Sequence, residues 1–202
     1  MRGSIIIFFF FITGVLTARM GWLPATLVEN DFSIYVLYGL MFLVGMSIGS
    51  DTKVLRGMKR QKATVVLVPL ATLLGTLAGC AAASFLLPGI RVWDSLAVGS
   101  GFAYYSLSSV FITELRGAEL GTVALIANVT RELFTLMCAP LLVRWFGKLA
   151  PICSGGATTM DTTLPVIVRF SGKEFVVVSI FHGFVTDFSV PFLVTFFCRM
   201  AA

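Results

Sequence analysis

Charge is the scarcest property of this 202-residue chain. Asp, Glu, Lys and Arg together make up only 12% of it, whereas 57% of the residues are hydrophobic. A typical soluble domain carries roughly twice that share of charged residues. The shortage of charge excludes an ordinary soluble domain and indicates an integral membrane protein.

Motifs for catalysis and metal binding are also missing from the sequence. The chain has one histidine and four cysteines, and the cysteines stand singly, without CxxC or metal-ligand spacing. We find no HExxH pair, no phosphate-binding loop and no nucleophile paired with a base. We therefore expect no enzyme activity, no cofactor and no metal site, with the cysteines packed as free thiols.

The net charge of +5 does not indicate a nucleic-acid partner, because much of it lies in one short loop. Five of the fifteen basic residues fall between positions 51 and 62 (Lys53, Arg56, Lys59, Arg60 and Lys62). Loops rich in Lys and Arg between apolar spans stay in the cytoplasm. We expect the bilayer, rather than a nucleic acid, to surround this chain.

Long apolar runs predict five full transmembrane helices, since a helix needs about 20 residues to cross a bilayer. With the basic loop inside, the N-terminus is predicted to be cytoplasmic and the C-terminus periplasmic. The N-terminal run is interpreted as a retained helix rather than a cleaved signal peptide. The predicted spans are about Ser4–Leu23, Phe32–Ile48, Ala63–Leu87, 118–146 and 174–198.

Two weaker segments, 94–116 and 151–170, are interrupted by glycine, proline and hydroxyl-bearing residues. Irregular backbone at membrane depth persists only where it is buried in protein or lines water. We therefore predict that both segments are re-entrant or discontinuous helices. Treating 94–116 as a full span would place Arg144 and Lys148 outside, against the charge rule.

The two weak segments resemble each other at an offset of 54 residues. "SGFAYYSLSSV" (Ser100–Val110) aligns with "SGGATTMDTTL" (Ser154–Leu164). Inverted repeats with broken helices are common in secondary transporters, although so thin an identity can also arise by chance. The predicted fold is an all-α polytopic membrane protein with about five full and two broken or re-entrant helices. It forms one transmembrane domain, 1–202, with three N-terminal spans in 1–93 and two broken-helix plus long-span units in 94–202.

The first candidate site is the stretch "PICSGGATTMDTTLP" (Pro151–Pro165). After the two glycines, the N–H groups of 157–160 are predicted to be unpaired at a helix start, where an anion such as a carboxylate binds. The hydroxyl groups offer oxygens to a cation or an amino acid. The alternative is an ordinary helix cap at the membrane surface. The candidates are Gly155, Gly156, Thr158, Thr159, Asp161, Thr162 and Thr163.

The long spans carry a second group of candidates. Glu132 lies in the middle of 118–146, with Asn128 on the same helical face, and a carboxylate at membrane depth usually marks a proton or substrate path. The alternative is a buried polar network, to which Arg131 would also belong. His182 and Asp187 lie in the last span, and the sequence leaves both site membership and simple packing open for His182. The end of the first weak segment carries three charged residues, and we predict that they form either a solvated turn or a gate: Glu114, Arg116 and Glu119.

The phrases "GSGFAYYSLSSVFITELRGAELGTVALIANVTRELFTL" and "SGGATTMDTTLPVIVRFSGKEFVVVSIFHGFVTDFSVPF" resemble the bacterial lysine exporter family (LysO type) over nearly the whole chain. The resemblance implies an inner-membrane protein that exports L-lysine and its analogue thialysine in exchange for protons. It places the family's "RE" on Arg131 and Glu132, and its "DFSVP" on Asp187–Pro191.

Many members of that family are longer at the N-terminus. The resemblance therefore implies the C-terminal subunit of a split exporter, with either a small membrane protein or a second copy of the chain supplying the remaining helices. Two other functions stay open at this point. One is a sodium or other cation/proton antiporter with sodium at the Thr/Asp site, and the other is a membrane subunit that does not transport.

Overall fold

The computed structural model describes residues 62–87 and 89–201, together with scattered positions between 9 and 21 and Met46. The predicted spans Ser4–Leu23 and Phe32–Ile48, and nearly all of the basic loop, lie outside the described residues or only partly within them. Every regular element in the described part of the chain is a helix. The predicted all-α class is confirmed.

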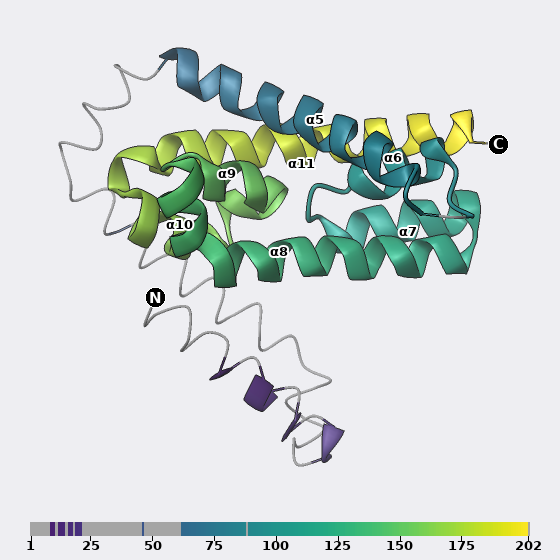
Figure 1. Ribbon diagram of the computed structural model, residues 1–202, viewed down its shortest axis with the longest axis horizontal. Coiled ribbons are helices and arrows are strands. Elements are labelled where there is room, and N and C mark those ends of the chain that lie inside the picture. Colours follow the sequence, from purple (N-terminus) through teal and green to yellow (C-terminus); the bar gives the residue numbers. More distant parts are fainter. Residues whose placement is uncertain are drawn as a thin grey trace.

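Three long helices run along the long axis of the molecule (Figure 1): α5 (Lys62–Ser84), α8 (Ala118–Phe146) and α11 (Val176–Met200). α5 and α11 pack against each other, whereas α8 lies on the opposite side of the molecule. Within the described residues, three helical stretches are long and apolar enough to cross a membrane: Ala63–Ser84, Ala118–Phe146 and Lys173–Met200. Each exceeds the ~20 residues that a crossing needs. They confirm the last three of the predicted spans.

The first weak segment is a broken helix, as predicted. It forms α6 (Val92–Gly99) and α7 (Tyr105–Arg116), separated by a five-residue tip at 100–104. Within this tip, Phe102 and Ala103 take the left-handed backbone conformation, with φ of 43° and 69°. A left-handed residue cannot continue a right-handed helix, so the chain turns there. Both helices lie at the end of the molecule that holds the C-terminus (Figure 1).

The second weak segment is also broken, and it lies at the opposite end of the molecule (Figure 1). It forms α9 (Ala150–Gly155), the 3₁₀ helix η2 (Gly156–Met160) and α10 (Leu164–Ser171), and a 3₁₀ turn, η3 (Lys173–Phe175), leads into α11. Prolines stand in the first turns of α9 and α10, where their missing N–H costs nothing. Gly156, with φ of +60°, ends α9.

Each broken segment is a helical hairpin, and a long helix follows each hairpin. The first tip is 100–104, and the second tip is 153–163, which comprises the end of α9, η2 and the turn after it. α6 and α7 precede α8, while α9, η2 and α10 precede α11. The two long helices run in opposite directions, and the two hairpins enter from opposite ends (Figure 1). This arrangement agrees with an inverted repeat of the two aligned stretches. It brings the tips of both hairpins to the middle of the molecule.

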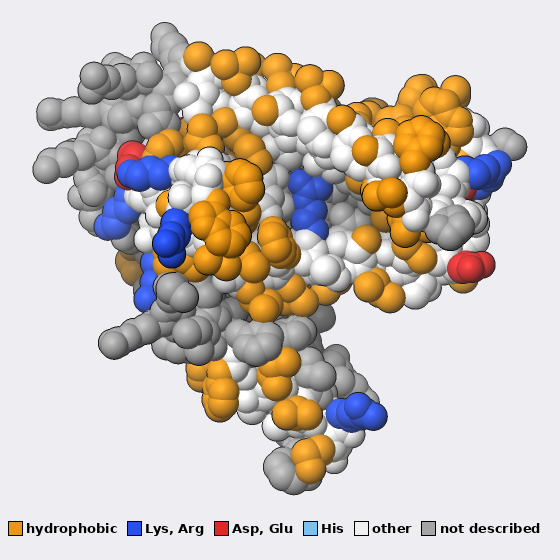
Figure 2. All heavy atoms as spheres, viewed as in Figure 1, with side chains coloured by type: hydrophobic (Ala, Val, Ile, Leu, Met, Phe, Trp, Pro, Cys, Tyr) orange, Lys and Arg blue, Asp and Glu red, His pale blue; other side chains and the backbone are white. Residues whose placement is uncertain are grey.

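The apolar core lies between the hairpins and the long helices. One cluster joins α6, the first tip, α7, α8 and α11 around Phe102, Ile112 and Val190, and a second joins α5, α9, α10 and α11 around Ile152 and Ile167. Many large apolar side chains are also exposed on the long helices, among them Leu74, Ile126 and Phe188, and Figure 2 shows apolar side chains along the outer edge of α5. A surface of this kind fits a protein surrounded by lipid.

Candidate functional site

The tips of the two hairpins touch at the centre of the molecule. The Ala157 N–H donates a hydrogen bond to the Phe102 carbonyl oxygen over 2.8 Å. A Cβ added at Gly156 would overlap that same carbonyl, so only glycine allows the two backbones to approach this closely. In the 54-residue alignment Gly156 is the counterpart of Phe102, and the contact therefore joins equivalent points of the two repeats.

A second glycine, Gly183 on α11, lets the second tip pack directly on that helix. A Cβ added at Gly183 would lie 2.7 Å from the Met160 backbone nitrogen and 2.9 Å from the Ala157 carbonyl oxygen. Those distances are shorter than normal packing contacts. The glycine in "FHGF" therefore positions η2 against the helix.

Asn128 on α8 fixes the first tip. Its side-chain oxygen accepts a hydrogen bond from the Ala103 N–H over 2.8 Å, and its amide nitrogen donates to the Val98 and Ala124 carbonyl oxygens over 3.1 and 2.9 Å. Both N–H groups of the amide are thus used within the protein, and the side chain is buried. These contacts are those of the buried polar network, which was one of the two roles predicted for Asn128.

Arg131, one turn further along α8, joins both tips. Its guanidinium donates to the Ser154 and Cys153 carbonyl oxygens at the end of α9 over 2.8 and 3.1 Å, and to the Thr76 hydroxyl of α5 over 3.2 Å. It also lies 5.6 Å from the centre of the Phe102 ring, a cation–π contact. A positive charge at the C-terminal end of a helix is stabilising, and these contacts link the end of α9 to the first tip and to α5.

His182 on α11 contacts the second tip as Asn128 contacts the first. It lies 54 residues after Asn128, which is the same offset that aligns the two broken segments. Its Nδ1 lies 3.0 Å from the Thr159 hydroxyl and its Nε2 lies 2.9 Å from the Thr72 hydroxyl of α5. The side chain is fully buried. Both ring nitrogens have partners, and the ring links η2, α5 and α11.

The expected bare helix start at 157–160 is wrong. These residues form a 3₁₀ turn instead, and the Ala157 N–H is already bonded to the other tip. Most of the threonine hydroxyls are likewise used on backbone carbonyls: Thr158 donates to Gly155, Thr159 to Gly156 or Ser179, and Thr163 to Thr158. Thr162 is the exception, because its hydroxyl donates to the Asp161 carboxylate over 3.3 Å.

A small pocket opens beside the joined tips, with a volume of ≈ 140 Å³. Two of its residues carry carboxylates, and both belong to the second repeat: Asp161, from the turn between η2 and α10, and Asp187, from α11. Tyr104 and Met160, which sequence reasoning did not single out, also line it; Tyr104 stands inside the repeated stretch, which was the available signal. The full lining is Tyr104, Ala157, Thr158, Met160, Asp161 and Asp187.

Glu132 belongs to the same neighbourhood. It does not line the pocket itself, but the Thr162 hydroxyl and the Asp161 carboxylate both act on the Glu132 carboxylate electrostatically. Asp161 in turn interacts with Asp187, and the Tyr105 hydroxyl group is near both Glu132 and Asp161. Two of the predicted carboxylates therefore share one pocket, and the third, Glu132 on α8, is electrostatically coupled to Asp161.

The three carboxylates have no positive partner among the described residues. The ion pairs found there join Asp94 to Arg91 and Arg116, and Lys148 to Glu174. Half-buried acids without counter-ions favour proton uptake or the binding of a cation. Within the same residues, no group of His, Cys, Asp and Glu side chains is arranged to hold a metal ion.

Two hairpins that enter from opposite ends and meet at their tips beside acidic side chains form an architecture that secondary transporters with inverted repeats share. Residues 8–198 match the sequence profile of the family described as "Lysine exporter LysO". The chain belongs to this family, as its resemblance predicted.

Two relatives support the assignment. A protein of Escherichia coli (strain K12) named "Lysine exporter LysO" is 36% identical over 172 residues, which cover 83% of this chain and 55% of that protein. The chain thus spans about half the length of that relative. A Haemophilus influenzae protein, provisionally named a lysine exporter, is 33% identical over 180 residues, or 88% of this chain and 91% of that protein. No solved structure matches the chain significantly.

Proposed function

We propose that this chain takes part in the export of L-lysine, and of analogues such as thialysine, across the bacterial inner membrane in exchange for protons. The observation that carries the proposal is the group of three carboxylates, Glu132, Asp161 and Asp187, that lies beside the joined tips without a positive partner in the described part of the chain. Membership of the lysine exporter family supports the choice of substrate.

Lysine carries a positive charge on its side chain as well as the ammonium and carboxylate groups of every amino acid. Acidic side chains at membrane depth suit the ammonium groups, because a buried negative charge is costly unless a cation or a proton neutralises it. A carboxylate that holds either lysine or a proton, but not both, exchanges one for the other. We assign this exchange to Glu132, with Asp161 and Asp187 as further ligands of ammonium groups.

The rest of the site keeps these carboxylates in place. Asn128, Arg131 and His182 use their polar atoms on the two tips, so we propose that they position the tips rather than bind lysine. Glu114 is an exposed residue of α7 and does not line the central pocket. The gate role predicted for it therefore stays a prediction. A small membrane protein or a second copy of the chain is the proposed source of any further helices that the transport cycle requires.

Radiolabelled lysine uptake into everted membrane vesicles tests the proposal. In such vesicles export appears as uptake, and a lumen made acidic should drive it. Glu132→Gln keeps the size of the side chain but removes its charge, so we expect the variant to reach the membrane in normal amounts yet lose uptake. Glu174→Gln, an exposed acid at the end of the molecule opposite the C-terminus, is the matched control and should retain it.

Undiminished pH-driven uptake by Glu132→Gln would refute the role given to this carboxylate. Proton movement that follows a sodium gradient and ignores lysine would instead identify a cation/proton antiporter. A wild-type chain that moves neither lysine nor sodium, alone or with the partner described above, would identify a subunit without transport activity of its own.

A further inference from the structure

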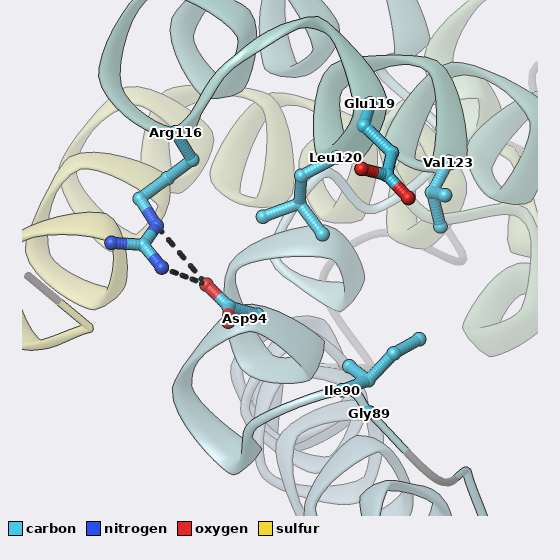
Figure 3. Close-up of a pocket in the computed structure, with 7 residues that line it drawn as sticks. All are labelled: Gly89, Ile90, Asp94, Arg116, Glu119, Leu120 and Val123. Carbon is cyan, nitrogen blue, oxygen red and sulfur yellow. Dashed lines mark hydrogen bonds and ion pairs between the residues drawn. The ribbon is translucent and has the colours of Figure 1, made fainter.

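A second pocket lies away from the joined tips, at the end of the molecule that holds the C-terminus (Figure 3). Its volume is ≈ 250 Å³, larger than that of the central pocket. It opens between the start of α6, the α7–α8 junction and the first turns of α8. Its lining is Gly89, Ile90, Asp94, Arg116, Glu119, Leu120 and Val123.

The cationic side of this pocket is Arg116, the last residue of α7. Its Nη2 lies 2.9 Å from Asp94 Oδ1, its Nε donates to the same oxygen over 3.1 Å, and its Nη1 donates to the Ala201 carbonyl oxygen over 3.0 Å. A guanidinium has five N–H groups, so two remain for another acceptor. The side chain is held in place, since only 16% of it is exposed.

The anionic side is Glu119, in the first turn of α8. It is exposed and forms no ion pair within residues 62–87 and 89–201. Figure 3 shows the Glu119 carboxylate and the Arg116 guanidinium on two sides of the pocket, with the Leu120 side chain between them and Ile90 facing them from below. Val123 extends the apolar wall beside Glu119.

A pocket with a cation donor at one side, an apolar middle and a free carboxylate at the other fits a dipolar molecule with a hydrocarbon stem. Arg binds carboxylates through paired N–H groups, apolar side chains cover methylene groups, and a carboxylate receives an ammonium. Amino acids with a cationic side chain have this order of groups. Asp94 is already paired with Arg91 and Arg116, so Glu119 is the acid that remains for the ligand.

We propose that this pocket is a second, peripheral binding site for lysine, separate from the site at the tips. Arg116 receives the α-carboxylate, Glu119 receives the side-chain ammonium, and Ile90, Leu120 and Val123 contact the methylene chain. The choice of lysine among cationic amino acids rests on the proposed function. The site lies at one end of the molecule, where it holds substrate on its way to or from the central carboxylates.

Equilibrium binding of radiolabelled lysine to the purified chain in lipid nanodiscs tests this site. We expect the wild type and the Glu174→Gln control to bind two lysines per chain, and Glu132→Gln to bind one, at the peripheral site. Adding Glu119→Gln to Glu132→Gln should weaken that remaining binding by about tenfold or more, because the ligand loses a hydrogen bond between charged groups. Norleucine, which lacks the side-chain ammonium, should bind Glu132→Gln as weakly as lysine binds the double variant.

Three results would overturn the peripheral site. They are no lysine binding to Glu132→Gln, lysine binding to the double variant as tight as to Glu132→Gln, and equal binding of norleucine and lysine to Glu132→Gln. None of these results would touch the proposed function, which fails separately if wild-type vesicles show no pH-driven lysine uptake. Near-ultraviolet circular dichroism of each variant distinguishes lost binding from lost folding.

Discussion

The contact between the two tips requires glycine at position 156. Substitution of Gly156 by alanine is therefore the most direct structural test of that contact. Gly156 has φ of +60° and ψ of −131°, a conformation that is nearly restricted to glycine and costs a residue with a side chain about 1–3 kcal/mol. In addition, the new Cβ would overlap the Phe102 carbonyl oxygen. The tips must then separate, which breaks the hydrogen bond from the Ala157 N–H.

Gly147 provides a matched control for Gly156→Ala. It also has a positive φ, +88°, but a Cβ added there meets nothing within 4 Å. Gly147→Ala therefore carries only the backbone cost, whereas Gly156→Ala also loses a buried hydrogen bond and the packing around it. A bond of this kind contributes about 0.6–1.7 kcal/mol inside a membrane protein, and we expect the free energy of unfolding to fall by about 2–5 kcal/mol in total.

The assay is reversible unfolding of the two variants in bicelles, followed by far-ultraviolet circular dichroism. The expected order of stability is wild type, then Gly147→Ala, then Gly156→Ala, with lysine uptake lost only in Gly156→Ala. Equal losses of stability in the two variants would show that the tips do not depend on this close approach. The reasoning about the joined hairpins would then be wrong.

Two further substitutions test neighbouring parts of the site. Asn128→Ala leaves the Ala103 N–H without its partner and should lower the free energy of unfolding by about 1–3 kcal/mol. The control is Thr130→Ala, at an exposed position on the same helix. A loss no larger than that of the control would show that Asn128 does not stabilise the first tip. Asp187→Asn removes one carboxylate from the central pocket. The lysine concentration needed for half-maximal uptake should then rise by about tenfold. An unchanged concentration would exclude Asp187 from substrate binding.

Much of the architecture could be predicted from the sequence, because the bilayer imposes simple rules on length and polarity. The runs at 118–146 and 174–198 stand almost unchanged as helices, and the glycine-rich and hydroxyl-rich segments are broken, as expected. Even the pairing of Asn128 with His182 follows from the 54-residue offset. Both side chains turned out to fix the tip of their own repeat.

The individual roles of the polar residues could not be predicted in the same way. Sequence shows that Thr158, Thr159 and Thr163 carry hydroxyl groups, but it does not show that these groups donate to nearby backbone carbonyl oxygens of α9 and η2. The pairing of the Ala157 N–H with Phe102 depends on a contact between segments 55 residues apart. Such long-range contacts decide which groups stay free, and here the free groups are carboxylates.

Proton movement driven by a lysine gradient is the most direct test of the central claim. The purified chain would be reconstituted in liposomes that contain lysine and a pH-sensitive dye, then diluted into lysine-free buffer. We predict that the lumen becomes acidic as lysine leaves, and that Glu132→Gln shows no such change. Lysine efflux without any acidification, or acidification that Glu132→Gln retains in full, would contradict exchange of lysine for protons at this carboxylate.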